Sequence, residues 1–231
     1  MLVAGFPAAA FGTNCYVVAA AAGERCVVVD PGVGVAEHLD EVLSTHRLQP
    51  AAVLLTHGHI DHTFSVTPVC GANDVPAYIH PDDADLLSDP ARGFGPAIEQ
   101  MFAGSLHWTE PADVRPLPDG GPVQIAGMAI TVDHAPGHTR GSVLFRLPDA
   151  EDSRDLMLSG DVLFAGSIGR TDLPGGDYTA MMRSLATKIL PLADETVVLP
   201  GHGPRTTIGR ERTSNPYLAE AARTAAVAKG M

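Results

Sequence analysis

The feature of this sequence that most constrains its fold is a short run of metal-ligand residue types. The run reads His57-Gly58-His59-Ile60-Asp61-His62. It directly follows apolar residues 51–55, which we predict to form a buried strand. In an extended backbone alternate side chains point the same way, so His57 and His59 can reach one metal ion. If the chain then turns into a helix, Asp61 and His62 point elsewhere and can reach a second ion.

Three later segments repeat the pattern of a strand followed by a ligand-type residue in a glycine-rich turn. The predicted strands cover residues 128–132, 156–159 and 196–199. The turns after them carry His138, Asp161 and His202, respectively. Loops at strand ends present functional groups on a rigid scaffold. We therefore expect these three residues and the first run to build one active site.

Strand-like and helix-like segments interleave along the chain, which indicates an α/β or α+β layered protein. Further strands are predicted at residues 14–19, 25–30, 75–79, 123–125 and 142–145, and helices at 35–48, 82–87, 98–102, 178–190 and 216–229 with Asn215 as N-cap. Residues 88–120 read as irregular. Two halves, 1–120 and 121–231, each run strands first and helices later, with no linker between them. We expect one domain over residues 1–231.

Charge and cysteine content exclude some classes of protein. A formal net charge of −12 predicts repulsion from nucleic acid and from anionic membrane surfaces. No apolar stretch has the length of a membrane span, and the N-terminus lacks the basic region of a signal peptide. Cys15, Cys26 and Cys70 are an odd, unpaired set that suits buried packing in a reducing compartment. We expect a cytoplasmic protein.

Four segments together resemble the metallo-β-lactamase-fold hydrolases of the glyoxalase II (hydroxyacylglutathione hydrolase) type. They are the run from His57 to His62, Pro136-Gly137-His138-Thr139, Gly160-Asp161-Val162-Leu163-Phe164 and Pro200-Gly201-His202-Gly203. The segments occur in the family's order, and the similarity spans about residues 12–217. Residues 169–172 and 206–217 resemble the compact bacterial branch. The resemblance implies a four-layer αββα sandwich with two mixed β-sheets.

The resemblance also implies two divalent metal ions, with zinc favoured over iron and manganese. By motif, the first ion is held by His57, His59 and His138, and the second by Asp61, His62 and His202, with Asp161 bridging both. Asp61 and Asp161 thereby count as catalytic. A metal-bound hydroxide is the expected nucleophile, so no serine or cysteine nucleophile is required.

The substrate implied by the family is a small thioester such as S-lactoylglutathione. Arg140 and Arg170 are candidate contacts to an anionic substrate, although Arg170 has Asp172 as an alternative partner. The chain ends soon after residues 215–229, without the longer C-terminal helical region of larger family members, which opens the choice of thiol carrier. Residues 88–120 are a candidate lid, with Phe94, Met101 and Phe102 as candidate apolar contacts or plain packing residues.

Two rival functions are open at this point. A persulfide dioxygenase of the same fold, which shares Gly169-Arg170-Thr171-Asp172, uses one iron held by His57, His138 and Asp161. A non-catalytic metal-binding protein is the rival from another class, while lactonase and β-lactamase activities also stay open. The native metal and the oligomeric state are undetermined. The remaining histidines have structural interpretations: His38 and His46 on a helix surface, His80 as a cap, His107 in the irregular region, and His134 as a structural residue or a partner of a ligand.

Overall fold

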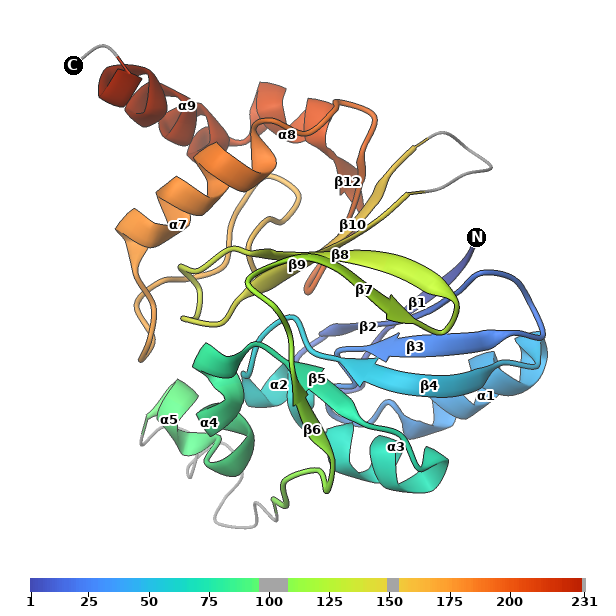
Figure 1. The fold of residues 1–231 in the computed structure, drawn as a ribbon. Helices are drawn as coiled ribbons and strands as arrows, with labels where there is room; N and C mark the ends of the chain where they lie inside the picture. Colours follow the sequence, from blue (N-terminus) through green and yellow to red (C-terminus); the bar gives the residue numbers. More distant parts are fainter. Residues whose placement is uncertain (96–107, 149–153, 230–231) are drawn as a thin grey trace.

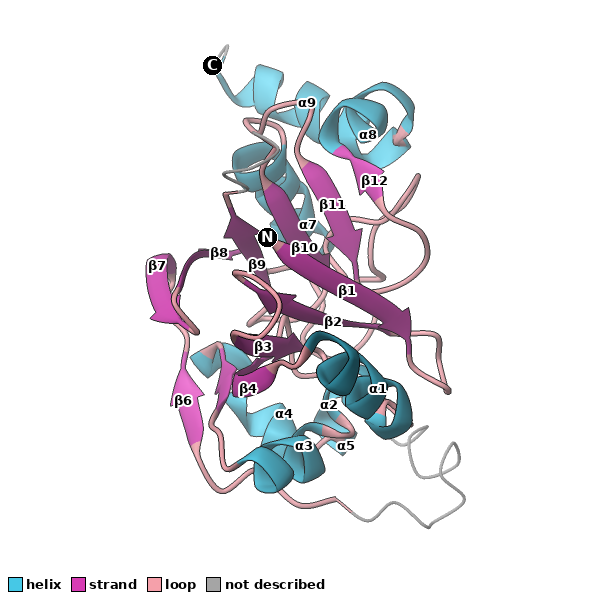
Figure 2. Cartoon of the chain, turned by 90° about the vertical axis from the view of Figure 1, so that its right-hand side faces the viewer, coloured by secondary structure: helices cyan, strands magenta, loops and turns pink. Residues whose placement is uncertain are grey.

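Two six-stranded mixed β-sheets lie face to face in the computed structural model, with helices on the outer side of each (Figures 1 and 2). The structure describes residues 1–95, 108–148 and 154–229. Residues 2–116 build the first sheet and residues 120–207 the second, so each predicted half of the chain forms one sheet. The predicted four-layer αββα sandwich is confirmed.

The first sheet has the strand order β1-β2-β3-β4-β5-β6. Its strands are β1 (Leu2–Pro7), β2 (Asn14–Ala19), β3 (Arg25–Val29), β4 (Gln49–Leu54), β5 (Ala77–Ile79) and β6 (Val114–Pro116). The pairs β1–β2 and β2–β3 are antiparallel, whereas β3, β4, β5 and β6 run parallel. The parallel strands therefore send their carboxyl ends to the same edge of the sheet.

The second sheet has the order β12-β11-β10-β9-β8-β7. Its strands are β7 (Gly120–Ile125), β8 (Met128–His134), β9 (Val143–Leu147), β10 (Leu156–Gly160), β11 (Val197–Pro200) and β12 (Thr206–Thr207). Strand β9 is antiparallel to both β8 and β10, and β10 is parallel to β11. Strands β8, β10 and β11 therefore all run in the same direction.

The helices cover the outer faces of the two sheets. The first half contributes α1 (Ala36–His46), α2 (Ile60–Thr63), α3 (Val66–Asn73), η1 (Pro81–Asp83), α4 (Ala84–Ser88) and α5 (Ala91–Phe94); the second contributes α7 (Tyr178–Ser184), the π-helical turn η2 (Leu185–Ile189), α8 (Ile208–Ser214) and α9 (Pro216–Lys229). Figure 1 shows α1 and α3 outside the first sheet and α7, α8 and α9 outside the second.

The core is divided between the layers because successive strand residues face opposite sides of a sheet. Val17 and Val28 pack toward α1 and α3, whereas their neighbours Val18 and Val27 pack between the sheets. Phe145 of β9 is fully buried in the layer between the sheets. Both faces of these strands are covered, which explains why they read as continuous apolar runs. The three cysteines are buried and free, as predicted.

Some elements differ from the prediction. Strands β1 and β12 and helices α3 and α8 were not predicted, and α5 and β6 lie inside residues 88–120, which we read as irregular. Strands β1, β6 and β12 lie at sheet edges; β1 contains Gly5 and Pro7, β6 ends in Pro116, and β12 has only two residues, so each gives a weak period-2 signal. The predicted helix at residues 98–102, with Met101, Phe102 and His107, falls outside the described residues. Among those described, no helix has the length and apolar character that crossing a membrane requires.

Candidate metal centre

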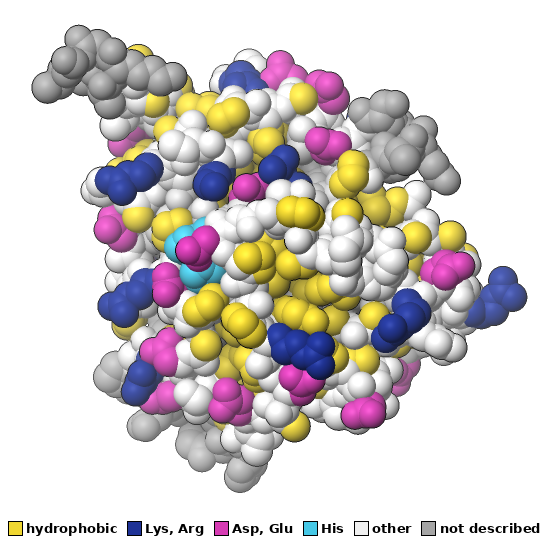
Figure 3. All heavy atoms as spheres, in the orientation of Figure 1, with side chains coloured by type: hydrophobic (Ala, Val, Ile, Leu, Met, Phe, Trp, Pro, Cys, Tyr) yellow, Lys and Arg dark blue, Asp and Glu magenta, His cyan; other side chains and the backbone are white. Residues whose placement is uncertain are grey.

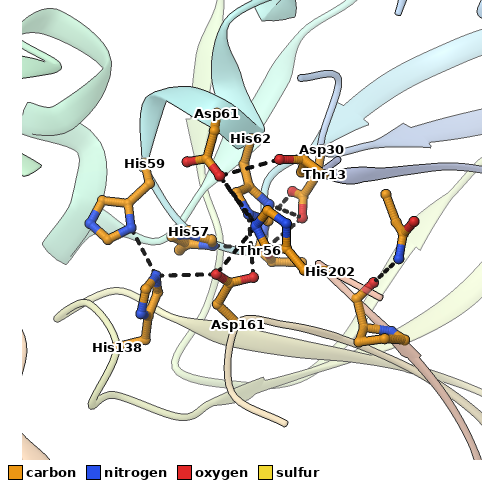
Figure 4. A network of polar contacts seen from close by, with 12 residues as sticks. Thr13, Asp30, Thr56, His57, His59, Asp61, His62, His138, Asp161 and His202 are labelled. Carbon is orange, nitrogen blue, oxygen red and sulfur yellow. Dashed lines mark hydrogen bonds and ion pairs between the residues drawn. The ribbon is translucent and has the colours of Figure 1, made fainter. Parts of the chain in front are cut away.

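The seven predicted ligand residues lie together at one edge of the sandwich, where the carboxyl ends of several strands meet (Figure 4). The first run follows β4 of the first sheet, and the other three segments follow β8, β10 and β11 of the second. Because these last three strands run in the same direction, His138, Asp161 and His202 emerge on the same side. Sheet topology thus gathers residues that are up to 145 positions apart, from His57 to His202.

The first run has the predicted local structure. The backbone is extended at His59, with φ −66° and ψ 142°, and α2 begins at the next residue. His57 and His59 therefore precede the helix, while Asp61 and His62 lie within its only turn. This change from extended to helical backbone aims the two pairs of side chains in different directions.

One group of potential ligands consists of His57, His59 and His138, whose ligand atoms all lie within 4.8 Å of one another. His59 Nδ1 and His138 Nε2 are 2.8 Å apart. The three rings are buried, with relative exposures of 3% or less. On the face drawn in Figure 3, histidine surface is visible as a small patch next to acidic side chains.

A second group consists of Asp61, His62 and His202, again with ligand atoms within 4.8 Å. His202 Nε2 lies 3.2 Å from Asp61 Oδ2 and 3.3 Å from His62 Nε2. His62 is fully buried, whereas the His202 side chain is 29% exposed. This group is therefore the one that opens toward solvent.

Asp161 lies between the two groups. Its Oδ1 is 3.3 Å from His62 Nε2 of the second group, and its Oδ2 is 3.5 Å from His138 Nε2 of the first. The same Oδ2 is 3.6 Å from His202 Nε2. A single buried carboxylate thus faces imidazoles of both groups, which is the arrangement expected of a shared ligand.

The ring nitrogens that face away from the centre are held by hydrogen bonds. His57 Nδ1 donates to Thr56 Oγ1 (3.1 Å), and Thr56 Oγ1 donates to Asp30 Oδ2 (2.6 Å). His62 Nδ1 donates to the same Asp30 oxygen (3.0 Å), and His138 Nδ1 donates to the carbonyl oxygen of Arg170 (2.7 Å). Such bonds set the tautomer of a metal-binding histidine and leave the other nitrogen as the electron-pair donor.

Asp30 and Thr56 are site residues that the sequence analysis did not identify. Asp30 follows β3 directly and precedes Pro31-Gly32, so it repeats the pattern of an acid in a turn after an apolar strand. That signal was present in the sequence. A third unpredicted residue is Thr13, whose Oγ1 donates to Asp61 Oδ2 at 3.2 Å.

Burial and neighbouring charge shift the pKa values of His57 and His59 in one direction and that of His62 in the other. Burial lowers the pKa of His57 well below its usual value and that of His59 to about 3. For His62, burial alone would lower the pKa, but Asp161 and Asp61 raise it well above its usual value. In Asp161, burial opposes ionisation, yet His62 and His138 hold its pKa below its usual value.

This donor set suits divalent metal ions. His57 Nε2 is buried and has no hydrogen-bond partner among the described residues, although buried polar atoms are normally paired. A buried neutral imidazole with an unused electron pair is the form of histidine that binds a metal. Imidazole and carboxylate ligands are those that zinc and iron accept. The geometry therefore fits two clusters of metal ligands that share a carboxylate.

The candidate substrate contacts lie near the centre but are not part of it. Arg170 is paired with Asp172 through two hydrogen bonds of 2.7 Å, as the sequence analysis anticipated. Arg140 is exposed and lines a cavity of about 210 Å³. The Phe94 ring lies 4.9 Å from that of His59, centre to centre, so it contacts a predicted ligand directly.

The other described histidines have structural roles, as predicted. His80 caps η1 by accepting a hydrogen bond from the backbone N–H of Asp82. His134 donates to the carbonyl oxygen of Arg140 at 2.7 Å and stacks on His80 at 4.0 Å. His38 is an exposed residue of α1. Likewise, Asn215 caps α9 by accepting a hydrogen bond from the N–H of Tyr217.

Gly201 permits the second group to close, and replacing it tests this geometry. A Cβ at Gly201 would lie 2.2 Å from Asp161 Oδ1 and 2.7 Å from His62 Cε1. We expect Gly201→Ala to displace both side chains and reduce bound metal from two ions to one or none per chain, measured by elemental analysis. The control is Gly71→Ala in α3, where a Cβ meets nothing within 4 Å. Unchanged metal content in Gly201→Ala would contradict the arrangement.

Comparison with known proteins identifies the family. The chain matches the model of the metallo-beta-lactamase superfamily over residues 8–202 and belongs to this superfamily. Its members are generally metal-dependent hydrolases. An uncharacterized protein of Mycobacterium tuberculosis is 49% identical over 94% of this chain and 98% of its own length. A protein named "probable metallo-hydrolase" of Bacillus subtilis is 37% identical over 84% of this chain and 88% of its own.

A more distant relative carries a specific name. The hydroxyacylglutathione hydrolase GloC of Haemophilus influenzae is 32% identical over 92% of this chain and 95% of its own length. Among solved structures, the B3 metallo-β-lactamase BLEG-1 has a TM-score of 0.83 at 38% identity, covering 94% of this chain and 99% of that one. TTHA1623 in a di-iron-bound form has a TM-score of 0.76 at 39% identity, covering 93% and 100%. ETHE1 from Myxococcus xanthus (TM-score 0.75, 22% identity, covering 95% and 85%) shares the fold.

Proposed function

We propose that this protein is a two-metal hydrolase that cleaves thioesters of the S-lactoylglutathione type or a related thiol conjugate. His57, His59 and His138 would hold one ion, and Asp61, His62 and His202 would hold the other. Asp161 would be the ligand that both groups share. Zinc is the proposed metal. Iron is the alternative, and the di-iron-bound form of the structural neighbour TTHA1623 supports it.

The observation that carries this proposal is the position of Asp161 between the two groups of ligand atoms. It lies 3.3 Å from His62 Nε2 and 3.5 Å from His138 Nε2. A mononuclear site built on His57, His138 and Asp161 alone leaves the convergence of Asp61, His62 and His202 unused. The complete second group therefore supports two ions over one.

The chain's own residues orient the reacting centre. When bound, the divalent ions supply a nucleophilic hydroxide near neutral pH and polarise a carbonyl oxygen. Asp30 and Thr56 fix the ring orientation of His57 and His62, which keeps their Nε2 atoms directed at the centre. A pre-set ligand geometry of this kind limits the reorganisation needed during the reaction.

A thioester suits this centre because thiolate is a good leaving group, which removes the need for a dedicated general acid. The similarity to a hydroxyacylglutathione hydrolase over 92% of the chain supports the same substrate class. Phe94 beside His59 and exposed Arg140 are the proposed apolar and cationic contacts of the substrate. The net charge of −12 favours a small-molecule substrate over nucleic acid or an anionic membrane. The three free, buried cysteines suit a reducing compartment, and we propose a cytoplasmic location.

The test is a substrate panel assayed with zinc-, iron- and manganese-loaded protein. The panel contains thioesters, with S-lactoylglutathione first, and also lactones, a β-lactam and a persulfide, with oxygen uptake recorded in parallel. We expect hydrolysis of more than one thioester and two metal ions per chain. Only the bound metals and water are needed for this reaction, so no oxygen is consumed.

Three outcomes of the panel would contradict this proposal. Persulfide oxidation with oxygen uptake, one iron per chain and no thioester cleavage would establish the dioxygenase function instead. Tight metal binding without turnover of any substrate would favour a non-catalytic protein on this fold. A β-lactam cleaved faster than every thioester would move the substrate assignment toward the activity named for BLEG-1.

A further inference from the structure

Asp83 is a buried carboxylate that belongs to neither group of ligands, yet it contacts the loops that carry one of them. It is 1% exposed and ends the short helix η1. Its Oδ2 accepts hydrogen bonds from Gly58 N–H (2.9 Å) and Thr139 Oγ1 (2.6 Å), and its Oδ1 accepts one from Gly141 N–H (2.7 Å). All three donors are far from Asp83 in sequence, at separations of 25 to 58 residues.

These donors belong to the two segments that supply His57, His59 and His138. Gly58 lies between the first two of these histidines, and Thr139 directly follows the third. Asp83 therefore connects a loop after β4 of the first sheet to a loop after β8 of the second. A backbone hydrogen bond from Val143 N–H to the Thr56 carbonyl oxygen (2.8 Å) is a second direct link between these two parts of the chain.

The packing around Asp83 shows that the loops approach it as closely as a backbone can. A Cβ at Gly141 would lie 2.7 Å from Asp83 Cβ and Cγ. A Cβ at Gly58 would lie 2.7 Å from Leu86 Cβ and 3.0 Å from the Asp83 carbonyl oxygen. Glycine at both positions lets η1 and the start of α4 press against both loops, so the carboxylate reaches their backbone N–H groups.

We propose that Asp83 is a positioning residue that sets the distance between the His57–His59 loop and the His138 loop, and thereby the metal affinity of that group. The proposal rests on the ligand assignment made above and is independent of the substrate. The N–H groups of Gly58 and Gly141 and the Thr139 hydroxyl each need a hydrogen-bond acceptor. An ionised carboxylate accepts on both of its oxygen atoms, whereas a side-chain amide accepts on only one. Partners of metal ligands affect affinity by about 10- to 100-fold.

The primary test is Asp83→Asn, which keeps the shape and replaces one acceptor oxygen by an NH₂ donor. Whichever way the amide is turned, an N–H of Gly58 or Gly141 then faces a donor. We expect the dissociation constant of the His57–His59–His138 ion to rise about 10- to 100-fold. The constant of the Asp61–His62–His202 ion should change by less than about threefold, well below that range. The measurement is a competitive zinc titration of metal-free protein against a chelator, with each step assigned by anomalous diffraction at limiting zinc.

A matched control separates positioning from general loss of stability. Glu211 is fully buried and likewise accepts three hydrogen bonds, from Gly166 N–H, Thr206 Oγ1 and Asn215 Nδ2. Glu211→Gln removes the same kind of acceptor between the segments that follow Asp161 and His202, and leaves the His57–His59 and His138 loops with their acceptor. It should therefore destabilise the fold without a selective rise in the dissociation constant of the His57–His59–His138 ion. Equal weakening of both sites in Asp83→Asn, or wild-type constants, would overturn the proposal.

A second pair of variants applies if Asp83→Asn does not fold. Thr139→Val deletes one donor to Asp83 and leaves the carboxylate in place, whereas Thr139→Ser keeps the hydroxyl. We expect Thr139→Val to weaken zinc binding selectively at the His57–His59–His138 group and Thr139→Ser to keep the wild-type dissociation constant there. Equal constants in the two variants would overturn the proposal. Wild-type protein that binds zinc in two steps but cleaves no thioester would reject the proposed substrate and leave this result standing.

Discussion

Asp161→Asn should remove both metal ions and nearly all activity. The carboxylate oxygens lie 3.3 Å from His62 Nε2 and 3.5 Å from His138 Nε2, so one side chain serves both groups. The amide lacks the negative charge and presents a donor to one of them. Because changes to residues that merely support a ligand cost about 10- to 100-fold in affinity, a shared ligand should cost more than about 100-fold at each site. Elemental analysis after dialysis at fixed free zinc measures this directly.

The comparison variant for Asp161→Asn is His202→Ala. His202 contacts Asp61 and His62 of the second group and is not part of the first. We therefore expect one ion per chain in His202→Ala and none in Asp161→Asn at the same free zinc concentration. Full occupancy of both sites in Asp161→Asn would show that the carboxylate does not bridge. Loss of both ions in His202→Ala would show that the sites do not fill independently.

Phe145→Ala should destabilise the fold by about 3–5 kcal/mol, the usual cost of deleting a large buried aromatic side chain. Phe145 has no exposed surface and lies in the central strand β9, between the two sheets. The cavity left there would be lined by rigid strands from both sheets, which cannot collapse into it. For a chain of this size we expect the melting temperature to fall by roughly 6–20 °C. Calorimetry of metal-free protein excludes stabilisation by bound ions.

Phe145→Leu is the matched control, because it keeps an apolar side chain in the same place. It should cost clearly less than the alanine variant, since a smaller volume is lost. If the free energy of unfolding of Phe145→Ala lay within about 1 kcal/mol of the wild-type value, the layer between the sheets would not be the close-packed core that the structure shows.

Much of the site could be read from the chain because its signals are local. The strand before His57, the extended backbone through His59 and the turn into a helix at Ile60 follow from the order of apolar, glycine and polar residues over a few positions. The same holds for the turns that carry Asp161 and His202. Each is a short pattern whose meaning does not depend on distant residues.

Other parts of the site depend on contacts between residues far apart in sequence. Asp30 supports His62 across 32 positions, and Asp83 reaches Gly141 across 58. An aspartate after a strand or in a short helix is common, and only its donors reveal a role. Arg170 pairs with Asp172, one of the two partners left open, and its contact to an anionic substrate stays a prediction. Hydrogen-bond partners of this kind are fixed by topology rather than by a local pattern.

The fold, too, was predictable in part from local sequence patterns and in part depends on contacts between distant segments. Continuous apolar runs such as those of β3 and β4 predicted buried strands, because a strand covered on both faces has no polar side. The edge strands β1, β6 and β12 escaped prediction, since each is held by one neighbour and its sequence is not required to alternate. The resemblance carried by four short sequence segments was sufficient to predict the layers, and the local patterns named the residues that the fold brings together. Only the parallel direction of β8, β10 and β11 decided that His138, Asp161 and His202 meet, because strand direction is a property of the assembled sheet.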